Sequence, residues 1–415
     1  MSKLIWLTLG AFAVGTETLV IAGILPQIAD DFGQSLAFTG QLVTLFALTY
    51  AVGSPVMAVV TGSIERKRLL VATLSLFAVA NVVAALAPGY AALVAARLLL
   101  ALAAATFMPA ASAYAALSVE PQRRGRALAL VYAGLTVATV LGVPIGTFIG
   151  QAVGWRFTFV AVAILSVLAV AGIAAALPRL AAPPPVSLAE RWAVARRKEV
   201  LGILLLTVLT LGGALTIYTY IAPFLTGAIG FDAGTIPLVL VAFGVAGAIG
   251  NLMSGYVGDR WELRKYVAVL LVVLSCAFIL LSLVATELDG AMAKALVVVG
   301  IAAWGLSGWG LPAAQQQRLV KLEPSHAPVL ISLNASAIYL GTALGAALGS
   351  LAITLVPVGC LGFVAAGMEV LGLVVLLATA ETRREAAGEA KAGAIAGERL
   401  AAAPGPASSW PRKAA

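Results

Sequence analysis

The sequence has little charge and few residues suited to catalysis. Only 11% of its 415 residues are Asp, Glu, Lys or Arg, about half of the fraction usual in soluble domains. No cluster of His, Cys or paired carboxylates lies in or beside its apolar segments, which argues against an enzyme. The phosphate-binding motif GxxxxGK[ST] is absent, which argues against an ATP-driven pump. The sequence also shows no filter-like loop or ring of charge that would indicate a channel.

The chain has one histidine and two cysteines. Cys276 and Cys360 lie in apolar segments without a local partner or metal-ligand spacing, so we expect them to pack as small apolar residues. His326 lies in a connection and is expected to be solvated. We therefore expect no metal and no cofactor.

Apolar residues make up 61% of the chain, and the mean hydropathy is +1.04. Segments of about 20 apolar residues, the length that crosses the hydrocarbon core of a bilayer, recur along the chain. The first is too long for a signal peptide and has no obvious cleavage site. The pattern predicts an all-α membrane protein with twelve transmembrane helices at about 4–26, 38–60, 69–88, 91–117, 127–150, 157–177, 200–224, 236–257, 266–286, 292–317, 328–353 and 356–380.

The net charge of +8 reports orientation rather than a nucleic-acid partner. Nearly all of the 26 Lys and Arg residues lie at the chain ends or in even-numbered connections. The other connections hold only Arg156 and Lys294, and the spans hold only Arg97. By the positive-inside rule, this asymmetry predicts that both termini are cytoplasmic.

A long polar interruption divides the spans into six plus six. We expect an N-terminal six-helix bundle at 1–177, a cytoplasmic linker at 178–199, a C-terminal bundle at 200–380 and a disordered tail at 381–415. Ser187 and Glu190 have the spacing of a capping box, which predicts a short linker helix. That helix could rest on the membrane or remain solvated.

The two halves repeat each other, as expected of pseudo-symmetric bundles related by an axis along the membrane normal. "MPAAS" around Pro109 resembles "LPAAQ" around Pro312. Glycines recur every fourth position in the fifth and eleventh spans, where they would let helices approach closely. We expect these rows at the interface where the halves pivot, with ordinary helix packing as the alternative. The candidate pivot residues are these glycines together with Pro144 of the fifth span: Gly142, Pro144, Gly146, Gly150, Gly341, Gly345 and Gly349.

Several motifs carry a resemblance to a known family. The connection between spans 8 and 9 contains a spaced set of acidic and basic residues, of which the connection between spans 2 and 3 has a shorter copy. "GLTVATVLGVPIGTFIG" (134–150), "GWRFTF" (154–159) and "YTYIAPFL" (218–225) add to it. Over about 1–380 the sequence resembles the major facilitator superfamily, and within it the 12-helix drug/proton antiporters of the arabinose-efflux-permease type. The resemblance implies gating loops that contain Gly62, Glu65, Arg66, Gly255, Asp259, Arg260 and Arg264.

The resemblance further implies a central cavity lined by spans 1, 4, 7 and 10 and flanked by spans 2, 5, 8 and 11. Polar and aromatic residues on these spans fit a largely apolar organic solute. For each residue taken alone, interhelical packing is the alternative. The candidates are Thr16, Tyr50, Tyr218, Tyr220, Asn251, Trp304, Trp309, Gln315, Asn334 and Tyr339.

Glu17 and Arg97 are the candidate proton-coupling residues. Their distances along the helices from the outer membrane surface place both in one polar layer. Burial favours a neutral carboxyl and a nearby cation favours an ionised one, so such a group could load and release a proton. A static ion pair between spans 1 and 4 is the alternative. Glu369, on an outer span, is expected to pack against a neighbour or to extend toward the membrane surface.

The leading hypothesis is a monomeric secondary transporter in the bacterial inner membrane that exports a small organic compound in exchange for protons. Its partners would be that solute, protons and the lipid bilayer. The alternatives are a proton symporter that imports a metabolite and, from another class, a membrane receptor without transport. The sequence does not identify the solute.

Overall fold

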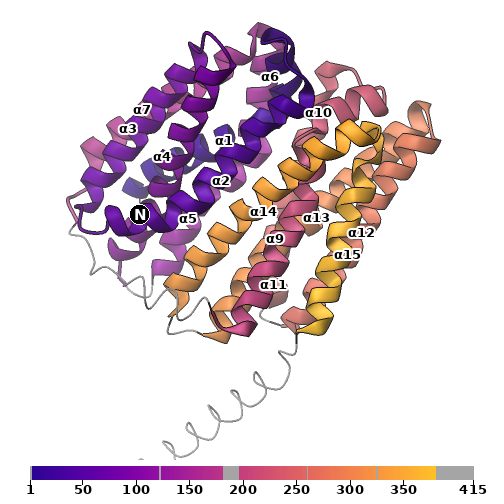
Figure 1. Ribbon diagram of the computed structural model, residues 1–415. Coiled ribbons are helices and arrows are strands. Elements are labelled where there is room, and N and C mark those ends of the chain that lie inside the picture. The colour runs from indigo at the N-terminus through magenta and orange to yellow at the C-terminus, as the bar shows by residue number, and fades with distance from the viewer. Residues whose placement is uncertain (1, 121–122, 181–195, 259, 324–325, 380–415) are drawn as a thin grey trace, which may run out of the picture. The chain divides into compact units, whose positions relative to one another are not determined.

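Long apolar helices account for nearly all of the described structure (Figure 1). The computed structural model describes residues 2–120, 123–180, 196–258, 260–323 and 326–379. The expected linker helix near Ser187 and Glu190, and the tail after residue 380, lie outside these residues. Within the described ranges, twelve helices are long and apolar enough to cross a membrane, which confirms the predicted all-α class.

The helices of the N-terminal half are α1 (Ile5–Asp31), α2 (Leu36–Val60), α3 (Arg66–Ala85), α4 (Tyr90–Leu117), α5 (Arg124–Val137), α6 (Val143–Val153) and α7 (Trp155–Ala176). The C-terminal half comprises α9 (Lys198–Tyr218), α10 (Ile221–Pro223), α11 (Ile236–Gly258), α12 (Leu263–Glu287), α13 (Gly290–Leu322), α14 (Ala327–Leu355) and α15 (Leu361–Ala378).

Local sequence explains where several helices begin. The Ser35 side chain accepts a hydrogen bond of 3.1 Å from the Phe38 N–H and so caps α2. Gly154 separates α6 from α7 with a φ of 105°, a conformation that costs a glycine little because it has no Cβ. The chain can therefore reverse direction sharply between the fifth and sixth spans.

Two spans are interrupted. The fifth consists of α5, the π-helical segment η3 (Ala138–Gly142) and α6. Pro144 follows this segment and lacks the N–H that a regular helix would use there, which explains the local change in hydrogen bonding. The seventh span breaks after Tyr218 and continues as α10 and the π-helical segment η4 (Phe224–Ala228).

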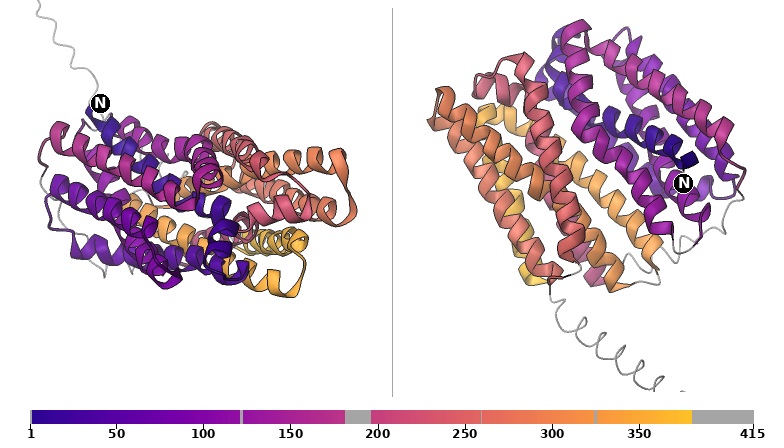
Figure 2. Two further views of the ribbon diagram at one scale, coloured as in Figure 1. Left: turned by 90° about the horizontal axis from the view of Figure 1, so that it is seen from above. Right: turned by 180° about the vertical axis from the view of Figure 1, so that it is seen from behind.

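Residues Met1–Leu376 form one compact unit. Within it, α1 packs against α5, α6 and α7, and α9 packs against α13 and α14. The halves meet where α2 runs along α14 and where α11 contacts α6 and η3 (Figures 1 and 2). We call this contact region the seam. We call the end of the helix bundle that carries Arg66, Arg123 and Arg264 the basic face. The other end of the bundle is called the opposite face.

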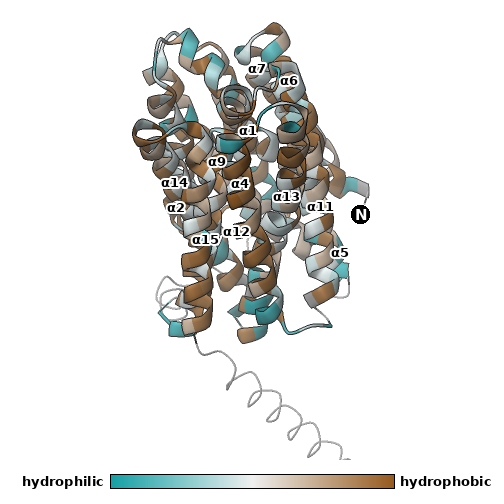
Figure 3. Cartoon of the chain, turned by 90° about the vertical axis from the view of Figure 1, so that its right-hand side faces the viewer, coloured by the Kyte–Doolittle hydropathy of each residue, from teal (hydrophilic) through white to brown (hydrophobic). Residues whose placement is uncertain are grey.

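The lateral surface is apolar along much of the helices, whereas hydrophilic residues gather toward their ends (Figure 3). Leu252 is 74% exposed and Leu377 is 68% exposed. Such side chains face hydrocarbon when the helices span a bilayer, so their exposure is compatible with stability.

The glycine row of the fifth span lies inside the N-terminal half, and its expected place at the seam is wrong. A Cβ added at Gly146 would lie 2.7 Å from Val20 Cγ2, and one at Gly150 would lie 2.5 Å from Ile24 Cγ2. Gly142 meets Thr16 in the same way. The row therefore provides the close approach of α1 to the fifth span.

The second row repeats this arrangement in the C-terminal half. A Cβ at Gly341 would lie 2.6 Å from the Val208 carbonyl oxygen, and one at Gly349 would lie 2.7 Å from that of Thr216. Gly345 approaches Gly212 in between. Small residues here let α14 approach α9, because backbone meets backbone along the row. The repeat is real, but it serves packing within each half.

Candidate functional site

The structure joins Glu17 of α1 to Arg97 of α4. The Arg97 Nη1 donates a hydrogen bond to Glu17 Oε1, and both side chains are 0% exposed. The guanidinium carbon of Arg97 also lies 4.2 Å from the centre of the Phe46 ring on α2, an arrangement that attracts cation to ring. The contact confirms that both charges occupy one layer of the bundle.

The pair is incompletely satisfied. Glu17 Oε2 and the Nε and Nη2 atoms of Arg97 are buried and have no hydrogen-bond partner in the described part of the chain. Buried polar atoms normally find partners, so unpartnered ones mark a place where water, a proton or a solute group can bind. Thr18, one residue beyond Glu17, donates a hydrogen bond of 2.8 Å to the Val14 carbonyl.

Two tyrosines cross the seam beside this pair. The rings of Tyr50 on α2 and Tyr339 on α14 are stacked, with centroids 3.5 Å apart and planes 16° apart. The Tyr339 hydroxyl interacts electrostatically with Glu17 and with Tyr132 of α5, and Tyr132 is 39% exposed. Both predicted tyrosines are thus brought to the charge pair, and Phe46 and Tyr132 join them. No periodic or motif signal in the sequence pointed to these two.

Four predicted cavity residues instead lie inside the C-terminal half. Trp304 is 2% exposed and packs against Phe243, Phe278 and Tyr218. Because Phe278 belongs to the outer helix α12, this cluster is part of the core of the C-terminal half. The Tyr218 hydroxyl within the cluster is buried without a partner.

Gln315 and Asn334 make polar contacts to α9. Gln315 Nε2 donates a hydrogen bond of 3.2 Å to the Ile203 carbonyl, and Asn334 Oδ1 accepts one of 3.1 Å from the Thr207 hydroxyl. Both are buried within the half. These hydrogen bonds link α13 and α14 to α9.

Of three further predicted cavity residues, two pack within their own halves and one lies on the side of α11 that faces the seam. Thr16 is buried against Gly142, and Trp309 lies against Gly247 of α11, so both pack within their own halves. Asn251 is exposed and lies two turns beyond Gly244 on the same face of α11. That face carries the contact with the N-terminal half.

Near the opposite face, side chains of the two halves are in direct contact across the seam. Gln41 Nε2 donates a hydrogen bond of 2.9 Å to Ser350 Oγ, which in turn donates one of 2.8 Å to the Ala37 carbonyl. Tyr220 packs its ring end directly on Gly40. These contacts link α2 with α14 and with the break after α9.

A second close approach joins α11 to η3. A Cβ added at Gly244 would lie 2.6 Å from the Thr139 carbonyl oxygen and 2.7 Å from Val140 Cα. Gly40 and Gly244 are therefore glycines of the seam itself. Sequence reasoning missed them because neither belongs to a row with glycine at every fourth position.

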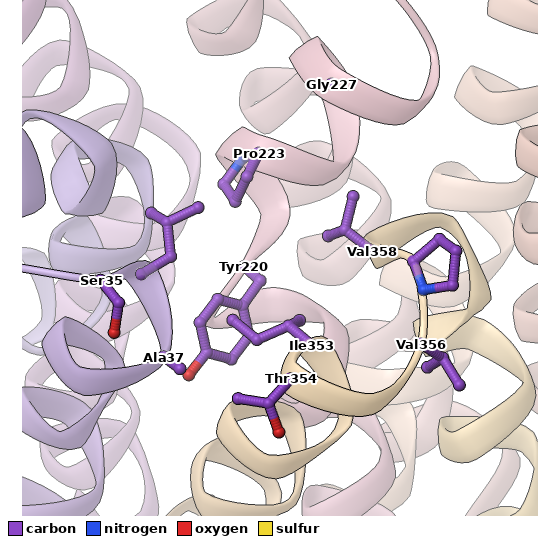
Figure 4. A pocket seen from close by; sticks show the side chains of 11 residues that line it. Ser35, Ala37, Tyr220, Pro223, Gly227, Ile353, Thr354, Val356 and Val358 are labelled. Carbon is purple, nitrogen blue, oxygen red and sulfur yellow. The ribbon is translucent and has the colours of Figure 1, made fainter.

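A cavity of about 460 Å³ lies outside the seam on the opposite face (Figure 4). Tyr220, predicted for the central cavity, lines this outer one together with Ser35 and Ala37 of the N-terminal half and Ile353 and Val358 of the C-terminal half. Because both halves supply its walls, its shape depends on how they meet.

Glu65 of the first predicted gating loop binds its own half. Its carboxylate accepts hydrogen bonds from the backbone N–H groups of Lys67 (2.7 Å), Arg68 (3.2 Å) and Leu180 (3.0 Å). Burial raises the pKa of Glu65, but these hydrogen bonds outweigh it and hold the pKa below its usual value. The Arg66 N–H donates back to the Leu180 carbonyl at 2.9 Å, and Gly62 is buried. The loop thus caps α3 and ties it to the segment after α7.

The second loop is described only in part, because Asp259 lies outside the described residues. The guanidinium carbon of Arg260 lies 3.8 Å from the centre of the Tyr256 ring. Arg264 Nη2 donates a hydrogen bond of 2.7 Å to the Leu376 carbonyl and so joins α12 to α15. Gly255 is exposed on α11.

Comparison with known proteins identifies the family. The sequence model of the Major Facilitator Superfamily matches residues 7–321 and 204–411. The chain belongs to the major facilitator superfamily. Superfamily members transport solutes, so the twelve helices are those of a multi-pass membrane transporter.

Two relatives and one solved structure agree with this membership. The transporter YbcL of Bacillus subtilis is 34% identical, over 88% of this chain and 92% of the relative. A protein named "Probable sugar efflux transporter" from Helicobacter pylori is 29% identical, over 88% of this chain and 92% of the relative. The crystal structure of a bacterial homologue of the lysosomal transporter Spinster has a TM-score of 0.69 at 16% identity, over 90% and 93% of the two chains. It shows the superfamily fold.

Proposed function

We propose that this transporter exports a small, largely apolar organic compound in exchange for protons, and that Glu17 carries the proton. The observation behind the proposal is the buried Glu17–Arg97 pair with its unpartnered oxygen and nitrogen atoms. Intramembrane ionisable groups are costly and usually functional. Arg97 holds the ionised carboxylate, and protonation of Glu17 frees the guanidinium for water or solute.

The surroundings of the pair support a neutral, largely apolar solute. The Phe46 ring lies against the Arg97 guanidinium, and Tyr339, which is stacked on Tyr50, interacts with Glu17. Aromatic faces bind flat apolar surfaces well, while their hydroxyl groups orient a few polar atoms. Export is supported by the name of the H. pylori relative.

Orientation and movement complete the proposal. The positive-inside rule places the basic face and both termini in the cytoplasm of a bacterium, so the opposite face is outward. The contacts of Gln41, Ser350 and Tyr220 then close the outer side, and they must separate for release. The two six-helix halves at 1–177 and 200–380 would rock about the seam, with Asp259 and Arg260 as inner gating residues.

Transport assays test the proposal in two stages. A growth-inhibition panel in an efflux-deficient bacterial host first identifies a compound to which the chain confers resistance. Inside-out vesicles with an acidic interior should then accumulate this compound, and a protonophore should abolish the accumulation. The Glu17→Gln variant should accumulate none. Accumulation that ignores the protonophore would contradict proton coupling, and accumulation only in right-side-out vesicles with an inward proton gradient would indicate symport.

A further inference from the structure

Glu369 is the second buried acid of the membrane region. It lies on α15, its side chain is 0% exposed, and neither carboxylate oxygen has a hydrogen-bond partner among the residues that the structure describes. The expectation that it extends toward the membrane surface is therefore wrong, and the expectation that it packs against a neighbour is right.

The carboxyl group is seated against α9. A Cβ added at Gly213 would lie 2.5 Å from Glu369 Oε1 and 2.9 Å from the Ala365 carbonyl oxygen. The carboxyl therefore occupies space that any side chain at position 213 would need. Met368, the preceding residue, lies against Gly212 in the same way. Two adjacent glycines of α9 thus form the seat.

Among the described residues, no cation binds the Glu369 carboxyl. Arg264 of α12 binds the Leu376 carbonyl, seven residues and so about 10 Å along α15 from Glu369. Tyr218 of α9 faces Trp304 and Phe243, and Tyr266 of α12 pairs with Ser254. Among the described residues, none of the titratable side chains on these two helices binds the carboxyl: Lys198, Glu199, Tyr218, Arg264, Lys265, Tyr266, Cys276 and Glu287.

Physical chemistry then assigns a protonation state. An ionised carboxylate without partners in an apolar interior is far more costly than a neutral acid, because it loses its hydration and gains no compensating contact. Glu369 therefore holds a proton in this conformation. A leucine or methionine would fill the same space at lower cost, so an acid at this position indicates a use beyond packing.

We propose that Glu369 is a second proton-binding site, in the C-terminal half, which releases its proton when α9 moves. Helix α9 is the element able to move, because adjacent glycines and helix breaks are where helices bend. It contains the Gly212–Gly213 seat and ends at Tyr218. Two residues later, Tyr220 contacts Gly40 at the seam. A movement that opens the seam would thus alter the surroundings of Glu369. The inference rests on the proposed alternating movement of the halves.

The experiment isolates Glu369 from Glu17. The full chain carries Cys276→Ala and Cys360→Ala, plus reporter cysteines at Thr354 on the opposite face or Asn251 on the seam face of α11. The background Glu17→Gln/Arg97→Gln removes the first charge pair as a neutral unit. Labelling by a membrane-impermeant maleimide is measured between pH 5 and 9 with and without Glu369→Gln. Glu287→Gln, an exposed acid on α12, is the matched control.

The expected result is a pH-dependent ratio of labelling at the two reporters that disappears with Glu369→Gln and persists with Glu287→Gln. One proton bound in only one state changes the equilibrium by up to about tenfold per pH unit. A pH dependence that survives Glu369→Gln, or one absent from the background itself, would overturn the proposal.

Infrared spectroscopy provides a readout that does not depend on movement or transport. The full chain at neutral pH should show a carboxylic-acid C=O band that Glu369→Gln removes and Glu287→Gln retains. An unchanged band would show that Glu369 is ionised and would also overturn the proposal. If Glu17→Gln still exports with a proton gradient, only the proposed role of Glu17 fails.

Discussion

At the scale of single residues, the charged side chains inside the membrane region affect both stability and proton binding. Glu17 and Arg97 neutralise each other in a buried place, and removal of one partner leaves an uncompensated buried charge. Such a loss costs about 3–5 kcal/mol, whereas removal of both charges can be close to neutral. The pair is therefore both a stability element and a candidate proton site.

We expect Arg97→Gln and Glu17→Gln each to lower the thermal stability of the purified chain, and Glu17→Gln to do so more. Without Arg97, the Glu17 carboxyl can take up a proton and become neutral, whereas without the Glu17 carboxylate the buried Arg97 guanidinium keeps its charge. The double variant should recover most of the loss. Thermal unfolding of the four proteins in detergent measures the cycle, and additive losses in the double variant would contradict a coupled pair.

The stabilising contribution of Glu65 should decrease as the pH falls. Because its folded pKa is lowered, its stabilising contribution is present above the unfolded value of about 4.3 and is lost as pH falls through the folded value. Glu65→Gln should cost about 0.5–2 kcal/mol at pH 7, the range for loss of a helix cap. Unfolding of both proteins at pH 7 and near pH 3 tests this. A difference that is as large near pH 3 as at pH 7 would contradict the capping role.

Which residues bear charge inside the spans could be predicted from the sequence, but which way the aromatic residues face could not. A helix that is apolar all round carries no stripe to fix its rotation. Trp304 and Tyr50 therefore looked alike in the sequence, yet one packs in the core of a half and the other stacks across the seam. Phe46 was missed because a phenylalanine in an apolar span has no distinctive neighbours.

At the scale of helices, the glycine rows and the seam glycines have different effects. Twelve spans and their repeat could be predicted because length and spacing are properties of one helix. Which helix a glycine row touches depends on tertiary packing, and the rows meet α1 and α9 of their own halves.

We expect Gly244→Leu to reduce transport strongly with little loss of thermal stability. Its side chain would meet backbone atoms of η3, which cannot rotate away, so the halves would be held apart. Gly367→Leu is the matched control, since Gly367 is exposed and a Cβ there has no atom within 4 Å. Equal transport by the two variants would show that the α11–η3 contact is unimportant.

Gly146→Leu should behave differently. Its side chain would meet Val20 and Thr158 within the N-terminal half, where overpacking typically costs 1–3 kcal/mol or somewhat more. We therefore expect a lower unfolding temperature than for Gly244→Leu. The reverse order of unfolding temperatures would contradict the assignment of the row to packing.

At the scale of the whole membrane unit, the outer contacts between α2 and α14 should separate during each cycle. Gln41→Cys and Ser350→Cys, in a chain with Cys276→Ala and Cys360→Ala, place one thiol on each side of a contact that a hydrogen bond now joins. Because a cysteine is shorter than the glutamine it replaces, a short bifunctional thiol reagent that attaches through disulfide bonds should cross-link them and stop export, and a reductant should restore it. Full export by a completely cross-linked protein would show that this contact does not open.

We propose above all that solute leaves in exchange for a proton carried by Glu17. The most direct measurement follows proton movement in proteoliposomes that contain a pH-sensitive dye and start without a pH gradient. A solute gradient alone should drive protons in the opposite direction through the unmodified protein, and a protein with Glu17→Gln should move none. Proton movement that survives Glu17→Gln, or solute movement without protons in the unmodified protein, would contradict the account.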